Sequence, residues 1–122
     1  MRKFLSKKII ILLSCFILQP VFADCVEFNE EKFELFLKSK NKVELIFFSS
    51  WCSDCKEDLL KIKENQKNLK DKVIIINTFD RLEKGNQALK KLEIKLDCYF
   101  DKDRVLTKKY NIKAVPAHIY VN

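Results

Sequence analysis

The amino-acid sequence predicts an α/β fold in which helices cover a mostly parallel sheet. Residues 43–48 and 73–76 form short, nearly continuous apolar runs, which are typical of strands buried on both faces. Segments whose apolar residues recur at helical spacing alternate with such runs along the chain. Strands that alternate with helices pair mainly in parallel, because each connecting helix crosses back over the sheet.

Each element follows from its local pattern. Asn29 is a suitable N-cap for a helix over residues 30–37, in which Phe33 and Leu37 share one face. A second helix is expected from Cys55 onward, with an apolar side made of Leu59, Leu60, Ile62 and later Leu69. The remaining expected elements are a strand at 73–76, a helix at 87–93, a strand at 96–100, a short helix at 104–110 and a strand at 117–121.

The first 23 residues are typical of a secretory signal peptide. Residues 1–8 carry four basic side chains and no acid, and residues 9–18 form an uncharged apolar run. As a helix this run would rise about 15 Å, half of a bilayer core, which is short for a transmembrane helix. Pro20 and Ala23 follow, so we expect cleavage after Ala23 and an exported domain at 24–122. Two alternatives stay open: lipidation at Cys15, and an uncleaved leader that anchors the chain in the membrane.

Composition excludes several classes of function for the domain at 24–122. It has 20 basic and 17 acidic residues, a formal net charge of +3 without a concentrated basic stripe, so nucleic-acid binding is not expected. Its 99 residues allow one small domain. Gly85 is the single glycine, which excludes a glycine-rich phosphate-binding loop, and a single histidine, His118, cannot build a multi-histidine metal site. We expect no cofactor and no bound metal.

Cysteine usage points to disulfide chemistry. The expected domain has four cysteines, and an even count suits an exported protein. Cys52 and Cys55 lie where a buried strand gives way to a helix. There the free backbone N–H groups and the positive end of the helix dipole stabilise a thiolate and lower the pKa of the first cysteine. We therefore expect Cys52 to attack disulfides and Cys55, one turn further on, to resolve the mixed disulfide.

Two other interpretations of the cysteine pair stay open. A structural zinc site needs a second pair of ligands, and the remaining candidates, Cys25, Cys98 and His118, are dispersed at unrelated spacings. The pair could also be a purely structural disulfide. Redox chemistry is the interpretation that the strand-to-helix position favours.

Two segments resemble the signatures of the thioredoxin-like superfamily. Residues 45–56 resemble its active-site segment, with Trp51 before the first cysteine and Lys56 after the second. Residues 110–121 resemble its other signature, a Val115–Pro116 step that leads into a strand. The resemblance implies that Pro116 is cis and lies against the cysteine pair, and that Trp51, Val115 and Pro116 contact the substrate. It also implies protein thiols and disulfides as substrates.

The spacing of the two signatures is similar to that in one branch of this superfamily. From Cys55 to Pro116 there are 61 positions, more than in plain thioredoxin, and the surplus corresponds to the helix–strand unit at 87–100. Such an insertion resembles the bacterial envelope thiol–disulfide oxidoreductases of the TlpA and ResA type, which often act as reductants in cytochrome c maturation. The resemblance implies a three-layer thioredoxin-like fold, a location in the periplasm or cell envelope, and a membrane thiol reductase as electron donor.

The sequence departs from the family pattern at three places. The buried carboxylate that the family keeps six residues before the first cysteine is Ile46 here, and Glu44 lies two residues further back on the same face. The chain ends at Asn122, where the family continues with a further strand and a helix; we expect either a truncated sequence or completion by a partner. The third departure is the pair of residues between the cysteines.

Ser53 and Asp54 stand between the cysteines and are expected to tune the couple together with Lys56. The acid should raise the pKa of the Cys52 thiol, while Lys56 and the helix dipole oppose this change. On this balance we favour a reductant.

Three residues remain to be placed. We expect a structural disulfide between Cys25 and Cys98, with two small apolar side chains as the alternative. His118 follows the proline closely, and we expect a solvent or core histidine. The second class of function is a binding module of the same fold, either redox-inactive or a copper-chaperone-like protein with Cys52, Cys55 and His118 as ligands.

Overall fold

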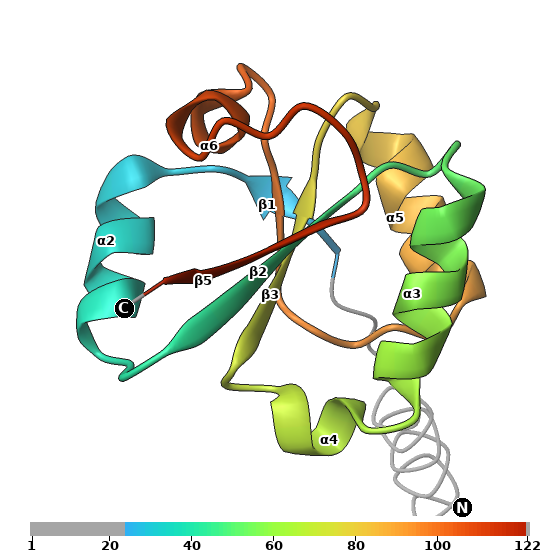
Figure 1. Ribbon diagram of the computed structural model, residues 1–122, viewed down its shortest axis with the longest axis horizontal. Coiled ribbons are helices and arrows are strands. Elements are labelled where there is room, and N and C mark those ends of the chain that lie inside the picture. Colours follow the sequence, from blue (N-terminus) through green and yellow to red (C-terminus); the bar gives the residue numbers. More distant parts are fainter. Residues whose placement is uncertain (1–23, 122) are drawn as a thin grey trace, which may run out of the picture.

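The computed structural model describes residues 24–121, and the expected leader at 1–23 lies outside the described residues (Figure 1). Within this range five strands form one sheet in the order β1-β4-β3-β2-β5. The first four pair in parallel, and β5 runs antiparallel to β2 at one edge. The strands are β1 (Val26–Glu27), β2 (Val43–Phe48), β3 (Val73–Asn77), β4 (Cys98–Phe100) and β5 (Ala117–Val121).

Helices cover both faces of the sheet, as Figure 1 shows. α3 and α5 lie on one face, and α2 and α6 lie on the other, so the predicted three-layer α/β arrangement is confirmed. The helices are α2 (Glu30–Lys38), α3 (Ser53–Lys63), α4 (Gln66–Leu69), α5 (Leu82–Lys91) and α6 (Val105–Lys109).

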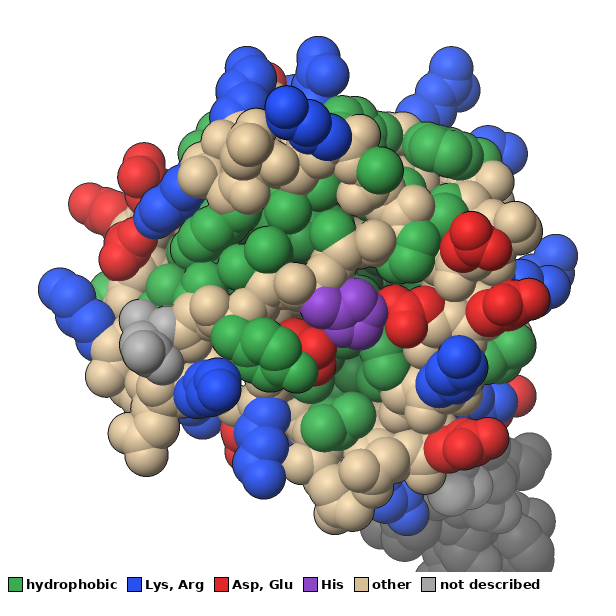
Figure 2. All heavy atoms as spheres, in the orientation of Figure 1, with side chains coloured by type: hydrophobic (Ala, Val, Ile, Leu, Met, Phe, Trp, Pro, Cys, Tyr) green, Lys and Arg blue, Asp and Glu red, His purple; other side chains and the backbone are tan. Residues whose placement is uncertain are grey.

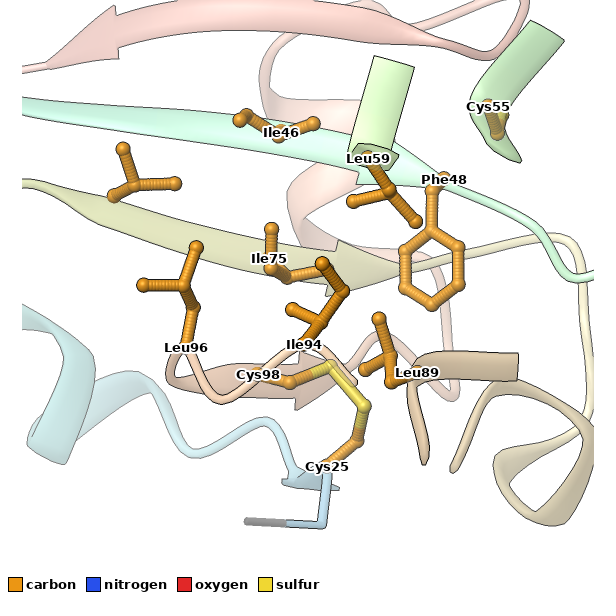
Figure 3. Close-up of a cluster of buried hydrophobic side chains, with 11 residues drawn as sticks. Cys25, Ile46, Phe48, Cys55, Leu59, Ile75, Leu89, Ile94, Leu96 and Cys98 are labelled. Carbon is orange, nitrogen blue, oxygen red and sulfur yellow. A yellow bond between two sulfur atoms is a disulfide. The ribbon is translucent and has the colours of Figure 1, made fainter. Parts of the chain in front are cut away.

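Two apolar clusters, one on each face of the sheet, hold these layers together. Successive side chains of a strand point to opposite faces, so β2 and β3 contribute to both clusters. Ile46 and Ile75 pack with α3 and α5, whereas Phe47 and Ile76 pack with α2 and α6. Figure 3 shows the cluster on the α3 and α5 face, including Phe48 at the end of β2 nearest to Cys55. Burial on both faces explains why the sequences of these strands are continuous apolar runs.

Several element boundaries differ from the sequence-based expectation. The helix after Cys55 breaks at residues 64–65 into α3 and α4, and β4 begins at Cys98 rather than at residue 96. The two-residue strand β1 was not predicted. α5 begins at Leu82 rather than at residue 87. Gly85 is normally unfavourable within a helix, so the sequence pattern did not predict these first turns.

Gly85 is required because α5 packs closely against β3. A Cβ atom on residue 85 would overlap the side-chain amide of Asn77, the last residue of β3. Asn77 is fully buried, and its amide nitrogen donates a hydrogen bond to the carbonyl oxygen of Arg81 at 3.3 Å, just before α5. The glycine thus sets the approach of α5, which forms one wall beside the cysteine pair.

We predict that Gly85→Ala lowers the free energy of unfolding by about 1–3 kcal/mol, because the added methyl group overpacks this contact. Urea unfolding measures the change, with Gln87→Ala on the exposed side of the same helix as the control. The double variant Asn77→Ala/Gly85→Ala removes the amide that the methyl group meets, so the two losses should be less than additive. Additive losses would contradict the contact.

The N-terminal strand is tied to the sheet by a disulfide between Cys25 and Cys98 (Figure 3). Their Cα atoms are 4.4 Å apart, and both residues are buried. The backbone N–H of Cys25 also donates a hydrogen bond to the Asn86 side chain of α5 at 2.8 Å. These bonds hold a strand of two residues that has few ladder hydrogen bonds of its own.

Removal of this disulfide in Cys25→Ala/Cys98→Ala is expected to lower the free energy of unfolding by about 2–4 kcal/mol, because the bond closes a long loop. The two cysteines are 73 positions apart, against 3 for Cys52 and Cys55. Thermal and urea unfolding without reductant provide the test. The matched control Cys52→Ala/Cys55→Ala should lose much less, and equal losses would contradict the loop argument.

Candidate active site

The two cysteines lie at the N-terminus of α3, directly beyond the end of β2. Cys52 is the N-cap residue, with extended backbone, and its Sγ accepts a hydrogen bond from the backbone N–H of Cys55 at 3.1 Å. The two residues form a disulfide, with Cα atoms 5.2 Å apart. Cys55 is buried, whereas Cys52 is partly exposed. Cys52 is therefore the more accessible sulfur for a partner molecule.

The second sequence signature lies against this pair. The carbonyl oxygen of Val115 is 3.6 Å from Cys52 Sγ, although the two residues are 63 positions apart. The Val115–Pro116 peptide bond is cis, and Val115 packs against both apolar clusters. Because β5 runs antiparallel to β2, β5 begins next to the C-terminal end of β2. The topology thus brings both sequence signatures to the same end of the sheet.

The segment before Cys52 is tied to the segment that follows β3. Three hydrogen bonds link them: Ser49 Oγ to the Thr78 carbonyl, Ser50 N–H to the Asp80 carboxylate, and Trp51 Nε1–H to the Phe79 carbonyl. The last two are 2.6 Å and 2.9 Å long. Trp51 is fixed in this way although 67% of its surface is exposed. Sequence reasoning missed residues 78–80. Their position directly after a buried parallel strand could have identified them, because sites form at the carboxyl ends of such strands.

Three further residues of the motif segment lie on the outside of the first turn of α3. Ser53, Asp54 and Lys56 are all exposed. The structure places Asp54 in the first helical turn and Lys56 at the rim of the groove described next. Asp54 and Lys56 thus place opposite charges on the exposed first turn of α3, next to the cysteine pair in the chain.

A groove of about 720 Å³ runs beside the cysteine pair between α3 and α5. Both cysteines line it, together with the apolar side chains Leu59, Ala88 and Leu92. α5 belongs to the inserted helix–strand unit that the spacing of the signatures predicted. The insertion therefore forms one wall of the site, which sequence reasoning did not anticipate.

The single histidine is held between two carboxylates. His118 Nδ1 is 2.8 Å from a Glu44 oxygen, and Nε2 is 2.5 Å from an Asp58 oxygen of α3. Figure 2 shows the histidine in purple with acidic side chains on both sides. His118 pairs with Ile46, the buried position at which the family keeps a carboxylate. Glu44 thus contacts the histidine, and Asp58 is a partner that sequence reasoning missed.

This arrangement bears on metal binding. Both ring nitrogens of His118 contact carboxylates, so neither is free to join Cys52 and Cys55 around a metal ion in this structure. Within residues 24–121 no group of three or more His, Cys, Asp or Glu side chains is placed to hold a metal ion. No observation here favours the copper-chaperone alternative.

The two carboxylates also change the titration of His118. Burial disfavours the charged imidazolium, but the hydrogen bonds and negative charges of Glu44 and Asp58 outweigh it and raise the pKa of His118 above 6.5. A pKa that is higher in the folded than in the unfolded state stabilises the fold. This contribution is complete below the unfolded pKa and is lost as the pH rises through the folded pKa.

We predict that an NMR titration of His118 gives a midpoint above 6.5, the ordinary value. The chain has one histidine, so its imidazole signals need no assignment. The stability advantage of the wild type over His118→Gln should also shrink between about pH 5.5 and 9, the range in which imidazole titrates and carboxylates stay ionised. A midpoint at or below 6.5, or a pH-independent difference, would contradict the role of the carboxylates.

The fold and the site together define a protein of the thioredoxin-like class: a CxxC pair at a helix N-terminus, faced by the residue before a cis-proline. The sequence matches the AhpC/TSA family over residues 21–122, and the chain belongs to this family. The predicted thioredoxin-like relationship is thereby confirmed. Comparison with curated protein sequences gave no match.

Solved structures of bacterial thiol–disulfide oxidoreductases have the same fold. A secreted disulfide oxidoreductase of Mycobacterium tuberculosis, homologous to DsbE of Escherichia coli, is 20% identical with a TM-score of 0.58, over 66% of this chain and 68% of its own. StoA of Bacillus subtilis is 23% identical with a TM-score of 0.59, over 67% and 66% of the two chains. The thioredoxin domain of a thiol–disulfide oxidoreductase of Bacteroides vulgatus is 22% identical with a TM-score of 0.61, over 73% and 66%.

The match therefore spans about two thirds of each of these structures. At these identities the likeness shows a shared fold, and the predicted thioredoxin-like architecture is confirmed. Among residues 24–121, no helix has the length and apolar character needed to cross a bilayer.

Proposed function

We propose that this protein is an exported thiol–disulfide oxidoreductase that exchanges disulfides with protein substrates through Cys52 and Cys55. The observation that carries the proposal is the asymmetric pair at the start of α3: an accessible Cys52 that receives a helix N–H, bonded to a buried Cys55. Accessibility suits attack on an external disulfide, and burial suits a resolving thiol that should react only within the protein.

The proposed reaction begins with the reduced pair. The Cys52 thiolate attacks one sulfur of a substrate disulfide, forming a mixed disulfide and releasing the other substrate sulfur as a thiolate, which takes up a proton. Cys55, as a thiolate, then attacks Cys52 Sγ and displaces the second substrate sulfur. The substrate gains two electrons and two protons, and the protein is left with the Cys52–Cys55 disulfide seen in the structure.

The surface around Cys52 supports a polypeptide substrate. Trp51 is exposed beside the cysteine, and the backbone of Val115, before Pro116, lies within 3.6 Å of its sulfur. An extended substrate chain can form main-chain hydrogen bonds with Val115 while its sulfur contacts Cys52. We assign Trp51, Val115 and Pro116 to substrate binding on this basis.

Two features support the reducing direction. The Val115 carbonyl oxygen facing Cys52 Sγ disfavours negative charge on that sulfur, and Asp54 in the first turn of α3 acts in the same sense. A less stabilised thiolate makes the disulfide form relatively more stable and the potential more negative. Lys56 and the positive end of α3 act in the opposite sense, so Ser53, Asp54 and Lys56 together tune the couple.

The same direction implies a source of electrons. After each turnover the Cys52–Cys55 disulfide must accept two electrons from another dithiol, and we propose a membrane thiol reductase for this role. The basic and apolar pattern of residues 1–23 supports export to the periplasm or cell envelope, with either a cleaved leader or an uncleaved anchor. Among the structural neighbours, one is described as secreted and another as an exposed lipoprotein.

A redox titration tests the proposal. The protein is equilibrated in graded dithiothreitol buffers and alkylated, and peptide mass mapping separates Cys52 and Cys55 from Cys25 and Cys98. We expect a reversible two-electron couple at Cys52 and Cys55 with a potential near about −270 mV, whereas about −120 mV would indicate an oxidant.

Matched variants make this titration specific. Cys25→Ala/Cys98→Ala should keep the couple, and Cys52→Ser should abolish both the couple and the reduction of a protein disulfide. A Cys52–Cys55 pair that is never reversibly reduced, or a folded wild type that fails to exchange with any disulfide, would overturn the proposal.

A further inference from the structure

The groove beside the cysteine pair is lined by one sign of charge. Four of its thirteen lining residues are lysines, and none is acidic. Lys56 comes from the first turn of α3, and Lys84, Lys90 and Lys91 come from α5. Both cysteines line the same groove, so a substrate bonded to Cys52 has part of its chain within reach of these lysines.

The acidic residues on and beside the two helices do not line the groove, and several have other partners. On α3, Asp58 contacts His118, and at the end of α5, Glu93 pairs with Lys63 at 3.8 Å. Asp80, between β3 and α5, accepts hydrogen bonds from the backbone N–H groups of Ser50 and Arg81. The remaining acids of the two helices, Asp54, Glu57 and Glu83, do not line the groove.

The floor of the groove is apolar. Phe48 and Leu59 are buried at its base, and Ala88 and Leu92 are partly buried along the α5 wall. The volume of about 720 Å³ is in the range of pockets that bind small ligands. An apolar floor with a cationic rim suits a ligand with an apolar side chain flanked by carboxylates.

We propose that this groove selects protein substrates in which acidic residues flank the reactive cysteine. The inference rests on the proposed thiol–disulfide exchange and adds the chemical class of the substrate. The substrate sulfur meets Cys52, its neighbouring backbone lies along Val115, and its acidic side chains meet Lys84 and Lys91 on the opposite wall. Lysines at a solvent-accessible rim act mainly on the rate of association, and salt screens their effect.

The test uses three synthetic peptides with the same intramolecular disulfide and acidic, neutral amide or basic residues beside it. The reduced full-length protein is mixed with each peptide, and the rate constant of exchange is measured from Trp51 fluorescence and by mass analysis. At low ionic strength we expect the acidic peptide to react at least about tenfold faster than the basic one. The ratio should fall toward one in 0.5 M salt.

Paired variants separate the groove from net charge. Lys84→Glu/Lys91→Glu should abolish or reverse the preference, and Lys84→Gln/Lys91→Gln should weaken it. Lys38→Glu/Lys67→Glu alters exposed lysines of α2 and α4 by the same net charge and should keep the preference.

The outcomes are distinguishable. Equal rates for the three wild-type peptides would overturn the inference and leave thiol–disulfide exchange intact. A preference lost equally in the Lys38/Lys67 variant would assign it to overall charge and would also overturn the inference. Absence of exchange with any peptide would overturn the proposed function, and the substrate class with it.

Discussion

Burial of β2 on both faces is the constraint on which the rest of the structure depends. Its side chains enter two different apolar clusters, so a shift of one residue in its pairing would exchange the two faces. The register Ile46↔Ile75 with β3 and Ile46↔His118 with β5 is fixed in this way. The end of β2, and hence Cys52, is then placed where β5 begins and where residues 78–80 leave β3. One strand thus positions the cysteine pair, the residue before Pro116 and the hydrogen bonds that hold Trp51.

The parts of this arrangement that depend on local pattern could be predicted from the sequence. Continuous apolar runs identified β2 and β3, because both faces of a central strand are buried. The position of Cys52 and Cys55 followed from a strand that gives way to a helix, and the resemblance at Val115–Pro116 implied a contact that the fold produces. Ile46 was recognised as the position where the family's carboxylate is missing.

The remaining features depend on contacts between segments far apart in the chain. β1 has only two residues and is held by a disulfide across 73 positions, so it has no pattern of its own. Gly85 allows α5 to pack closely against Asn77, but as a poor helix former it weakens the helical pattern in the sequence. The contact of Asp58 with His118 and the meeting of Lys56 with the lysines of α5 likewise require the packed structure. Sequence periodicity carries no information on which charged side chains face one another across a groove.

The charged and polar groups around Cys52 lie at two distances from its sulfur. Those next to the sulfur affect the redox potential most, and those on the far wall of the groove affect an approaching substrate most. The Val115 carbonyl oxygen and the Cys55 N–H lie 3.6 Å and 3.1 Å from the sulfur, where screening by salt is weak. Lys84 and Lys91 belong to the solvent-accessible far wall, and their interaction with the sulfur is screened by water and ions. In the proposed exchange, their field still acts on an approaching substrate whose acidic groups pass close to them. We therefore propose that the inserted helix affects which substrates associate without large changes in the Cys52–Cys55 couple, because Lys84 and Lys91 act on the substrate more than on the sulfur.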